Sequence, residues 1–309
     1  MGTTLRVAVA AADRADGITA IEDVFAAVRR LEGVLSTWRD DSEVAALNRA
    51  EPGRPMRLSA ELFGLLVEVA EWSRATSGAF DPAIGPLVDA WGLRGTGRVP
   101  SDGELAEALR ASGLGRFELS GATASATRHD ARAWLDTGGF GKGAALREAG
   151  RLLRARGIDA AVLNFGGQVL ALGADEGGKT WSIPVAHPSR RDESATRLQV
   201  RDRSVSTSSQ SERAEAVNGR RLGHIVDPRS GEPVTAWGSV TVVTEDPVVA
   251  DILSTALLVL GPEEALRWAE RRSDVGVLVL VEREGRVVPR WNRELERYLV
   301  VNTTSTGGG

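Results

Sequence analysis

The residues best suited to chemistry stand in the stretch Asp136-Thr137-Gly138-Gly139-Phe140-Gly141-Lys142-Gly143, which an apolar run with helical spacing follows. Glycines at 138, 139, 141 and 143 indicate a tight turn, or a backbone that another group approaches closely. Such a turn presents backbone N–H groups and the ammonium of Lys142 at a helix N-terminus, which suits an anion such as phosphate. The spacing is neither that of Walker A nor that of G-x-G-x-x-G. An anion or nucleotide site and a plain strand-to-helix turn are equally open on spacing alone.

A second candidate pair, Asp251 and Thr255, lies in the apolar segment 248–260, whose spacing predicts a helix. Residues four apart share a helix face, one turn from each other. A carboxylate and a hydroxyl aligned in this way suit Mg²⁺, which takes oxygen ligands, keeps waters and bridges to phosphates. A helix cap or a buried hydrogen-bonded pair is the alternative interpretation.

The three histidines stand in different settings. His224 precedes Ile-Val-Asp-Pro, a turn signal, where it could act as a general base or as a structural hydrogen-bonding group. His129 lies in an Arg-rich stretch and His187 precedes a proline, so we expect both at the surface.

Two further segments offer groups to a nucleotide. Thr207 and Ser208 belong to a hydroxyl cluster, 204–209, which could hold phosphate oxygens or form an ordinary loop. The segment 79–82, Ala-Phe-Asp-Pro, combines an apolar wall, backbone groups and one carboxylate, which suits the edge of a purine or flavin. A loop that packs the core explains this segment equally well.

The elements that must position these residues interleave helices and strands without a strict β-α-β order. Spacing predicts helices over 18–35, from Ser59 onward, and over 104–111, 144–156 and 248–260. Strands are predicted over 4–10, 117–119, 132–135, 160–164, 168–172, 181–185, 196–200, 239–244 and 275–281. This order favours an α+β fold, with a mixed β-sheet core flanked by helices, over a doubly wound parallel sheet. We expect a single domain over 1–301 and a loose tail over 302–309.

The composition bounds the class of function. The 309 residues are 42% apolar and 26% charged, as in soluble globular proteins, and the net charge of -4 favours neither nucleic acid nor an anionic membrane as partner. The lack of cysteine excludes disulfides, thiolate zinc sites, a cysteine nucleophile and a lipid-modified cysteine. With no signal peptide or membrane-spanning stretch in view, we expect a cytoplasmic protein; an exported form stays open if a leader was removed.

Taken in order, these motifs resemble the ApbE-type FAD:protein FMN transferases, or flavin transferases. The resemblance runs from Met1 to about Leu266. Its motifs are Met1-Gly2-Thr3, Asp41-Ser42-Glu43 through Asn48, Gly78 to Pro82, Asp136 to Gly143, Asn164 to Gly167, Ser206-Thr207-Ser208, His224 to Gly231, and Ala250-Asp251 through Leu257. The resemblance implies an ApbE-like (T-fold-like) architecture. It also implies an enzyme that uses Mg²⁺ to cleave FAD, transfers FMN onto a Thr or Ser hydroxyl of an acceptor protein, and releases AMP.

The resemblance further implies roles for single residues. Asp251, Thr255 and the backbone carbonyl at Gly141, where the family usually has Ala, would hold Mg²⁺. The residues implied to line the FAD are Met1, Trp38, Ala79, Phe80, Asp81, Gly139 and Lys142, with Thr207 and His224 near the pyrophosphate. Trp38 stands where the family commonly has Tyr and would stack on the isoalloxazine. His224 would take the proton of the attacking hydroxyl and Lys142 would neutralise charge, because phosphoryl transfer depends on positioning and charge stabilisation.

Some positions depart from the family's usual pattern. Arg147 and Gln168 stand where Asp is usual, and Ser209-Gln210-Ser211 replaces Gly-Asp-Tyr. These departures leave open a Mg²⁺-dependent FAD pyrophosphatase, in which water replaces the acceptor hydroxyl, and a diverged, non-catalytic flavin-binding protein. The hydroxyls of 303–306 raise self-modification as a further alternative to an inert tail.

Overall fold

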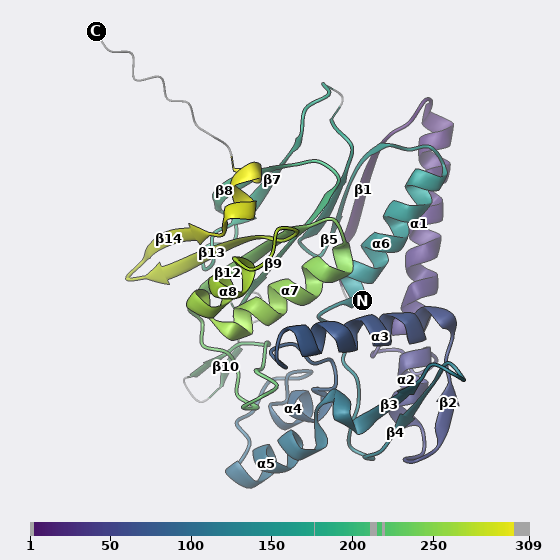
Figure 1. The fold of residues 1–309 in the computed structure, drawn as a ribbon, viewed down its shortest axis with the longest axis vertical. Coiled ribbons are helices and arrows are strands. Elements are labelled where there is room, and N and C mark those ends of the chain that lie inside the picture. Colours follow the sequence, from purple (N-terminus) through teal and green to yellow (C-terminus); the bar gives the residue numbers. More distant parts are fainter. Residues whose placement is uncertain (1–2, 176, 211–214, 218–219, 300–309) are drawn as a thin grey trace.

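A computed structural model describes residues 3–175, 177–210, 215–217 and 220–299. Met1, Ser211 and the expected tail, 302–309, lie outside the described residues. Figure 1 shows a large sheet with helices packed along it, and a group of shorter elements at one end. In the part of the chain that is described, no helix has both the length and the apolar character needed to cross a lipid bilayer.

The large sheet has seven strands in the order β1-β5-β6-β9-β12-β13-β14. Their bounds are β1 Leu5–Ala10, β5 Ala160–Phe165, β6 Gln168–Leu172, β9 Arg203–Ser209, β12 Gly238–Thr244, β13 Gly276–Arg283 and β14 Arg286–Trp291. The α+β prediction is confirmed, but all neighbouring strands in this sheet pair antiparallel, where a mixed sheet was expected. The reason lies in the connections. Two successive helices, α7 (Pro247–Leu260) and α8 (Pro262–Ala269), join β12 to β13, whereas a parallel neighbour is usually reached by a single helical crossover.

The connection between β5 and β6 is shorter than the sequence spacing indicated. Phe165 pairs with Gln168, so β5 runs one residue further than expected and only Gly166 and Gly167 form the turn. Both glycines have positive φ, 58° and 92°, as a tight turn whose twist matches the strands requires. The predicted strands, 160–164 and 168–172, left a three-residue connection, so the predicted end of the first strand was one residue too early.

The two faces of the large sheet are covered differently (Figure 1). Helix α7 lies on one face beside α6 (Gly141–Ala155), with α1 (Arg14–Leu35) packed against α6. The hairpin of β7 (Trp181–Ala186) and β8 (Ser194–Val200) covers the other face. Because side chains alternate along a strand, Val242 joins the buried cluster of α7, while Val243 joins that of the hairpin.

The shorter elements form the second part of the molecule. They are α2 (Glu43–Arg49), α3 (Ala60–Ala75), α4 (Gly85–Ala90), α5 (Asp102–Ala111), and the three strands β2 (Pro55–Arg57), β4 (Ser125–Arg128) and β3 (Phe117–Ser120), which pair in that order. The remaining elements are β10 (Glu215–Val217), β11 (Arg220–Leu222) and the short 3₁₀ segments η1 (Leu114–Arg116) and η3 (Arg293–Tyr298).

The strand expected over 132–135 is found instead at β4, a few residues earlier. The amide side chain of Asn48 takes the place of a neighbouring strand at Leu135. It donates to the carbonyl of Leu135 (3.0 Å) and accepts from its N–H (2.8 Å). The backbone N–H and C=O groups of an apolar segment can therefore find hydrogen-bond partners without a neighbouring strand.

Candidate active site where the glycine turn meets α7

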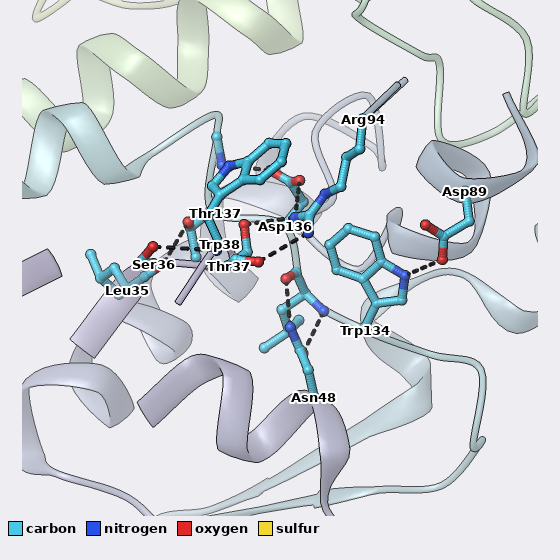
Figure 2. Close-up of polar contacts among 12 residues, drawn as sticks. Leu35, Ser36, Thr37, Trp38, Asn48, Asp89, Arg94, Trp134, Asp136 and Thr137 are labelled. Atoms are coloured by element: carbon cyan, nitrogen blue, oxygen red, sulfur yellow. Dashed lines mark hydrogen bonds and ion pairs between the residues drawn. The ribbon is translucent and has the colours of Figure 1, made fainter. Parts of the chain in front are cut away.

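The glycine-rich stretch forms the turn that leads into α6. The carbonyl of Thr137 accepts from the N–H groups of Phe140 (3.2 Å) and Gly141 (2.8 Å), which closes the turn. The Thr137 hydroxyl donates to the carbonyl of Leu35 (2.8 Å) at the end of α1 (Figure 2). The turn is therefore held in place by a different part of the chain.

Lys142, in the first turn of α6, meets Asp251 of α7. Its ammonium lies 2.8 Å from Asp251 Oδ1 and 3.4 Å from the carbonyl of Gly138. The second carboxylate oxygen, Oδ2, accepts from the backbone N–H of Gly143 at 3.0 Å. Asp251 is only 2% exposed, so this carboxylate is buried among a cation and a backbone donor. The structure thus brings together two groups that the sequence suggested separately.

Gly143 makes this meeting possible. A methyl group at this position would lie 2.3 Å from the carbonyl oxygen of Pro247 and 2.6 Å from the Cα of Val248. Both are backbone atoms in the first turn of α7 and cannot rotate away. Only glycine lets the two helices approach closely enough for the Asp251 carboxylate to reach the amide of residue 143.

The side-chain oxygens of Asp251 and Thr255 are of the type that Mg²⁺ takes as ligands. Thr255 lies one turn further along α7, and its hydroxyl donates to the Asp251 carbonyl at 3.3 Å. With the carbonyl of Gly141, the predicted ligands are all oxygen and include one carboxylate, a set that Mg²⁺ commonly completes with waters and substrate phosphates. Among the described residues there is no cluster of three or more His, Cys, Asp or Glu that would hold a metal by itself. The Asp251 carboxylate already faces a cationic group, which agrees with the chemistry of a cation site.

The Phe80 loop packs directly against the turn. The Phe80 ring is 3% exposed and lies on Gly139, where an added methyl group would be 2.8 Å from the ring. Ala79, beside it, is 1% exposed. The predicted apolar wall therefore borders the glycine turn, and its contact with FAD stays a prediction.

The carboxylate of Asp81 joins its own loop to the 3₁₀ segment η1. One oxygen accepts from the N–H of Ala83 (2.8 Å) and the other from the N–H of Leu114 (2.9 Å). Burial raises the pKa of Asp81 above its ordinary value, and the hydrogen bonds from Leu114 and Ala83 oppose this shift. Asp81 thus shapes the loop that carries Phe80.

Residues 204–209 belong to a strand, β9, and not to a loop. The side chains of Ser206 and Ser208 face α7, where both contact the hydroxyl of Ser254 (3.1 and 2.9 Å). Thr207 points to the other face of the sheet, and its hydroxyl lies 2.8 Å from that of Thr241. The predicted contact of Thr207 with the pyrophosphate stays untested, but the hydroxyls on the α7 side are those of the serines. Sequence reasoning missed Ser254, although it stands between Asp251 and Thr255.

His224 is half-buried in the segment after β11, and the next residue is held by Gln210. The Gln210 amide accepts from the N–H of Ile225 (3.1 Å) and donates to the carbonyls of Ile225 (2.7 Å) and Val234 (2.8 Å). One of the departures from the family pattern thus fixes the backbone of Ile225, the residue next to the predicted general base. Sequence reasoning treated Gln210 only as a missing carboxylate.

His187 does not lie at the surface as expected. It is 6% exposed, and its Nδ1 accepts from the N–H groups of Ser189 (3.2 Å) and Arg190 (3.2 Å). His187 therefore shapes a turn. His129 is partly exposed beside Glu118, in agreement with its expected place.

The other departures, Arg147 and Gln168, both hold the N-terminal end of α7. Arg147 makes a bidentate pair with Glu68 of α3 (2.6 and 2.7 Å) and bonds Asp246, the residue that caps α7. Burial alone would lower the pKa of Arg147, but its hydrogen bonds to Glu68 and Asp246 raise it above the ordinary value. The Gln168 amide donates to the carbonyl of Pro247 at 2.7 Å. Both residues therefore help to set the position of the helix that carries Asp251.

The fold, with its glycine turn beside a buried aspartate, defines a class of α+β proteins. Comparisons with known proteins agree with this fold. The model of the ApbE family matches residues 1–279. The chain therefore belongs to the ApbE family.

Curated relatives match along most of their length. The FAD:protein FMN transferase of Treponema pallidum is 33% identical over 283 residues, which is 86% of this chain and 78% of that protein. A protein of the same name from Klebsiella pneumoniae is 28% identical over 296 residues, 92% of this chain and 83% of that protein.

Solved structures agree in fold. The ApbE protein of Thermotoga maritima has a TM-score of 0.88 at 27% identity, with 96% of each chain covered. The flavin transferase ApbE of Vibrio cholerae has a TM-score of 0.86 at 26% identity, with 97% of this chain and 96% of that chain covered.

Proposed function

We propose that this protein is a Mg²⁺-dependent FAD:protein FMN transferase. It takes FAD as substrate, transfers FMN onto a Thr or Ser hydroxyl of an acceptor protein, and releases AMP. Membership of the ApbE family supports this function, as do the names of the relatives. The observation within the molecule that carries it is the meeting of Lys142, the Gly143 amide and the buried Asp251 at the glycine turn.

The reaction exchanges one P–O bond for another. The acceptor hydroxyl oxygen attacks the phosphorus of the FMN half, and the bond to the AMP half breaks, so that AMP leaves with the bridging oxygen. The proton of the hydroxyl passes to a base, for which His224 is our candidate. Such transfers depend on positioning and on neutralising the charge of the phosphates.

The residues of the site match these needs. Lys142 and the N-terminal amides of α6 would neutralise the pyrophosphate, as helix N-termini do for other anions. Asp251, Thr255 and the carbonyl of Gly141 would hold Mg²⁺, which, when bound, withdraws charge from phosphate oxygens. The apolar wall of Ala79 and Phe80 would meet an aromatic ring system.

The test is incubation of the protein with FAD, with and without Mg²⁺ and with a candidate acceptor protein, followed by chromatography for AMP and flavin. We expect AMP only with Mg²⁺, with flavin bound covalently to the acceptor. Asp251→Asn should abolish AMP release, whereas Asp192→Asn, an exposed aspartate, should not. Release of free FMN in place of labelled acceptor would establish the pyrophosphatase, and intact FAD with every acceptor tried would contradict the enzyme. The expected cytoplasmic location stays a prediction, which cell fractionation would test.

A further inference from the structure

An arginine stacks between two tryptophan rings next to the glycine turn. The guanidinium carbon of Arg94 lies 4.7 Å from the ring centroid of Trp38 and 4.1 Å from that of Trp134 (Figure 2). The Trp134 ring in turn lies on the backbone of Gly85, where an added methyl group would be 2.1 Å from it. The layers therefore rest on the backbone of α4 and end at Trp38.

Hydrogen bonds fix the arginine within this stack. Its terminal nitrogens donate to the carbonyl (3.0 Å) and the hydroxyl (2.6 Å) of Thr37, the residue before Trp38. The Trp134 indole N–H donates to Asp89 (2.8 Å), which fixes the second ring (Figure 2). A planar guanidinium can stack on an indole and hold such acceptors at the same time, whereas the ammonium of lysine cannot.

The same arginine is joined to the glycine turn. It donates to Asp136 Oδ2 at 3.2 Å, and the other oxygen of Asp136 accepts from the N–H of Gly138 at 2.7 Å. The carbonyl of Gly138 in turn accepts from Lys142. A continuous path of contacts therefore links Trp38 to the cation proposed to meet the pyrophosphate.

Trp38 itself is 66% exposed, more than any other large hydrophobic side chain in the described part of the chain. A tryptophan that is held firmly by a cation yet open to solvent gives up the free energy of burial. That is the arrangement expected of a surface on which a flat aromatic ligand stacks.

From these contacts we propose that Arg94 is a positioning residue that holds Trp38 as the platform for the isoalloxazine ring of FAD. The inference rests on the proposed function, since that function supplies the flavin. Arg94 fixes the platform relative to the glycine turn, so that ring and pyrophosphate of one FAD molecule reach their places together.

The test is FAD binding to the full-length protein in the presence of EDTA, followed by flavin fluorescence. Trp38→Ala and Arg94→Lys should each weaken binding about tenfold, as expected for a lost stacking contact. Flavin bound to Arg94→Lys should also be brighter at saturation than flavin bound to the unchanged protein, because it is less well stacked on the indole. The double variant should bind no more weakly than Trp38→Ala alone, because Arg94 acts through Trp38.

The chain offers a matched control. Arg272 also lies between two indole rings, 5.3 Å from that of Trp72 and 5.4 Å from that of Trp268, but its side chain donates hydrogen bonds to Asp274 and not to the glycine turn. Arg272→Lys should therefore bind FAD like the unchanged protein. Thermal melting would verify that each variant is folded. If Arg94→Lys does not fold, Thr37→Val, which removes one hydrogen bond, should weaken binding in the same direction.

Each other result overturns the inference. Unchanged binding by Arg94→Lys, or by Thr37→Val where Arg94→Lys does not fold, would show that the stack only stabilises the fold. If the double variant loses FAD affinity by the product of the two single effects, Arg94 acts independently of Trp38. Unchanged FAD binding by Trp38→Ala would show that Trp38 is not the stacking platform, and would leave the transferase proposal intact. Only a lack of FAD binding by the unchanged protein would overturn both proposals.

Discussion

The ammonium of Lys142 lies 2.8 Å from the carboxylate of Asp251, although the two residues are 109 positions apart in the chain. The pair closes the junction between the glycine turn and α7, and both groups belong to the proposed reaction. When Mg²⁺ binds, it would share the Asp251 carboxylate with this ammonium, because both are cations and the carboxylate is buried. Predictions about metal affinity and rate follow from this competition.

Replacing Lys142 by methionine should separate metal affinity from rate. Without the ammonium, Asp251 is more available to Mg²⁺, so the Mg²⁺ concentration giving half-maximal rate should fall. The maximal rate of AMP release should fall about 10²-fold, because a charge that stabilises the phosphate is lost. A titration with Mg²⁺ at saturating FAD and acceptor measures both quantities. A rate that falls together with metal affinity would show that Lys142 does not compete with the ion.

Replacing His224 by alanine should lower the rate and leave FAD affinity almost unchanged. Loss of a general base typically costs roughly 10²-fold or more in turnover. Single-turnover transfer and FAD titration would measure the two effects separately. His129→Ala is the control, because that residue lies partly exposed beside Glu118. An unchanged rate for His224→Ala would leave this histidine with a structural role only.

Adding a methyl group at Gly143 should destabilise the protein. The methyl carbon would meet the backbone of Pro247, and overpacking of this kind costs about 1–3 kcal/mol. Gly64→Ala is the matched control, because Gly64 lies in α3 with open space around it. This variant should be more stable than the unchanged protein by about 0.5–1 kcal/mol. Urea unfolding of both variants measures the difference. Equal stabilities would mean that α6 and α7 can separate freely at this point.

The raised pKa of Asp81 predicts a pH-dependent stability difference between the unchanged protein and Asp81→Asn. A carboxyl whose pKa is higher in the folded state than in the unfolded state favours folding when protonated. This contribution is present below the unfolded pKa and is lost as pH rises through the folded pKa. The melting temperature of Asp81→Asn, relative to that of the unchanged protein, should therefore rise over this interval.

Asp130 provides a control with the opposite sign. A hydrogen bond from the N–H of Arg132 lowers the pKa of Asp130, so its contribution is present above the unfolded pKa and is lost as pH falls. The relative melting temperature of Asp130→Asn should therefore fall as pH rises, with a small amplitude because the carboxylate is only partly buried and solvent screens it. Parallel pH profiles for the two variants would contradict the assigned directions.

The sequence by itself determined the features that depend on neighbouring residues. The four-residue spacing of Asp251 and Thr255 within an apolar run predicted their shared helix, and clustered glycines before Lys142 predicted the turn. The resemblance of motifs in order indicated the family, which the family model confirms. These features were accessible because helix periodicity and turn chemistry are local.

Only the tertiary structure decided the features that depend on contacts between distant segments. Leu135 was expected in a strand because its apolar neighbours fit one, but Asn48, 87 positions away, supplies its hydrogen bonds. Which hydroxyls of β9 face α7 follows from strand register, which a run of serines and threonines does not specify. No sequence motif pointed to Arg94, because its proposed role depends on the Trp38 and Trp134 rings, which only the tertiary structure places beside it. Long-range pairing depends on the whole set of packed surfaces, and so no local pattern encodes it.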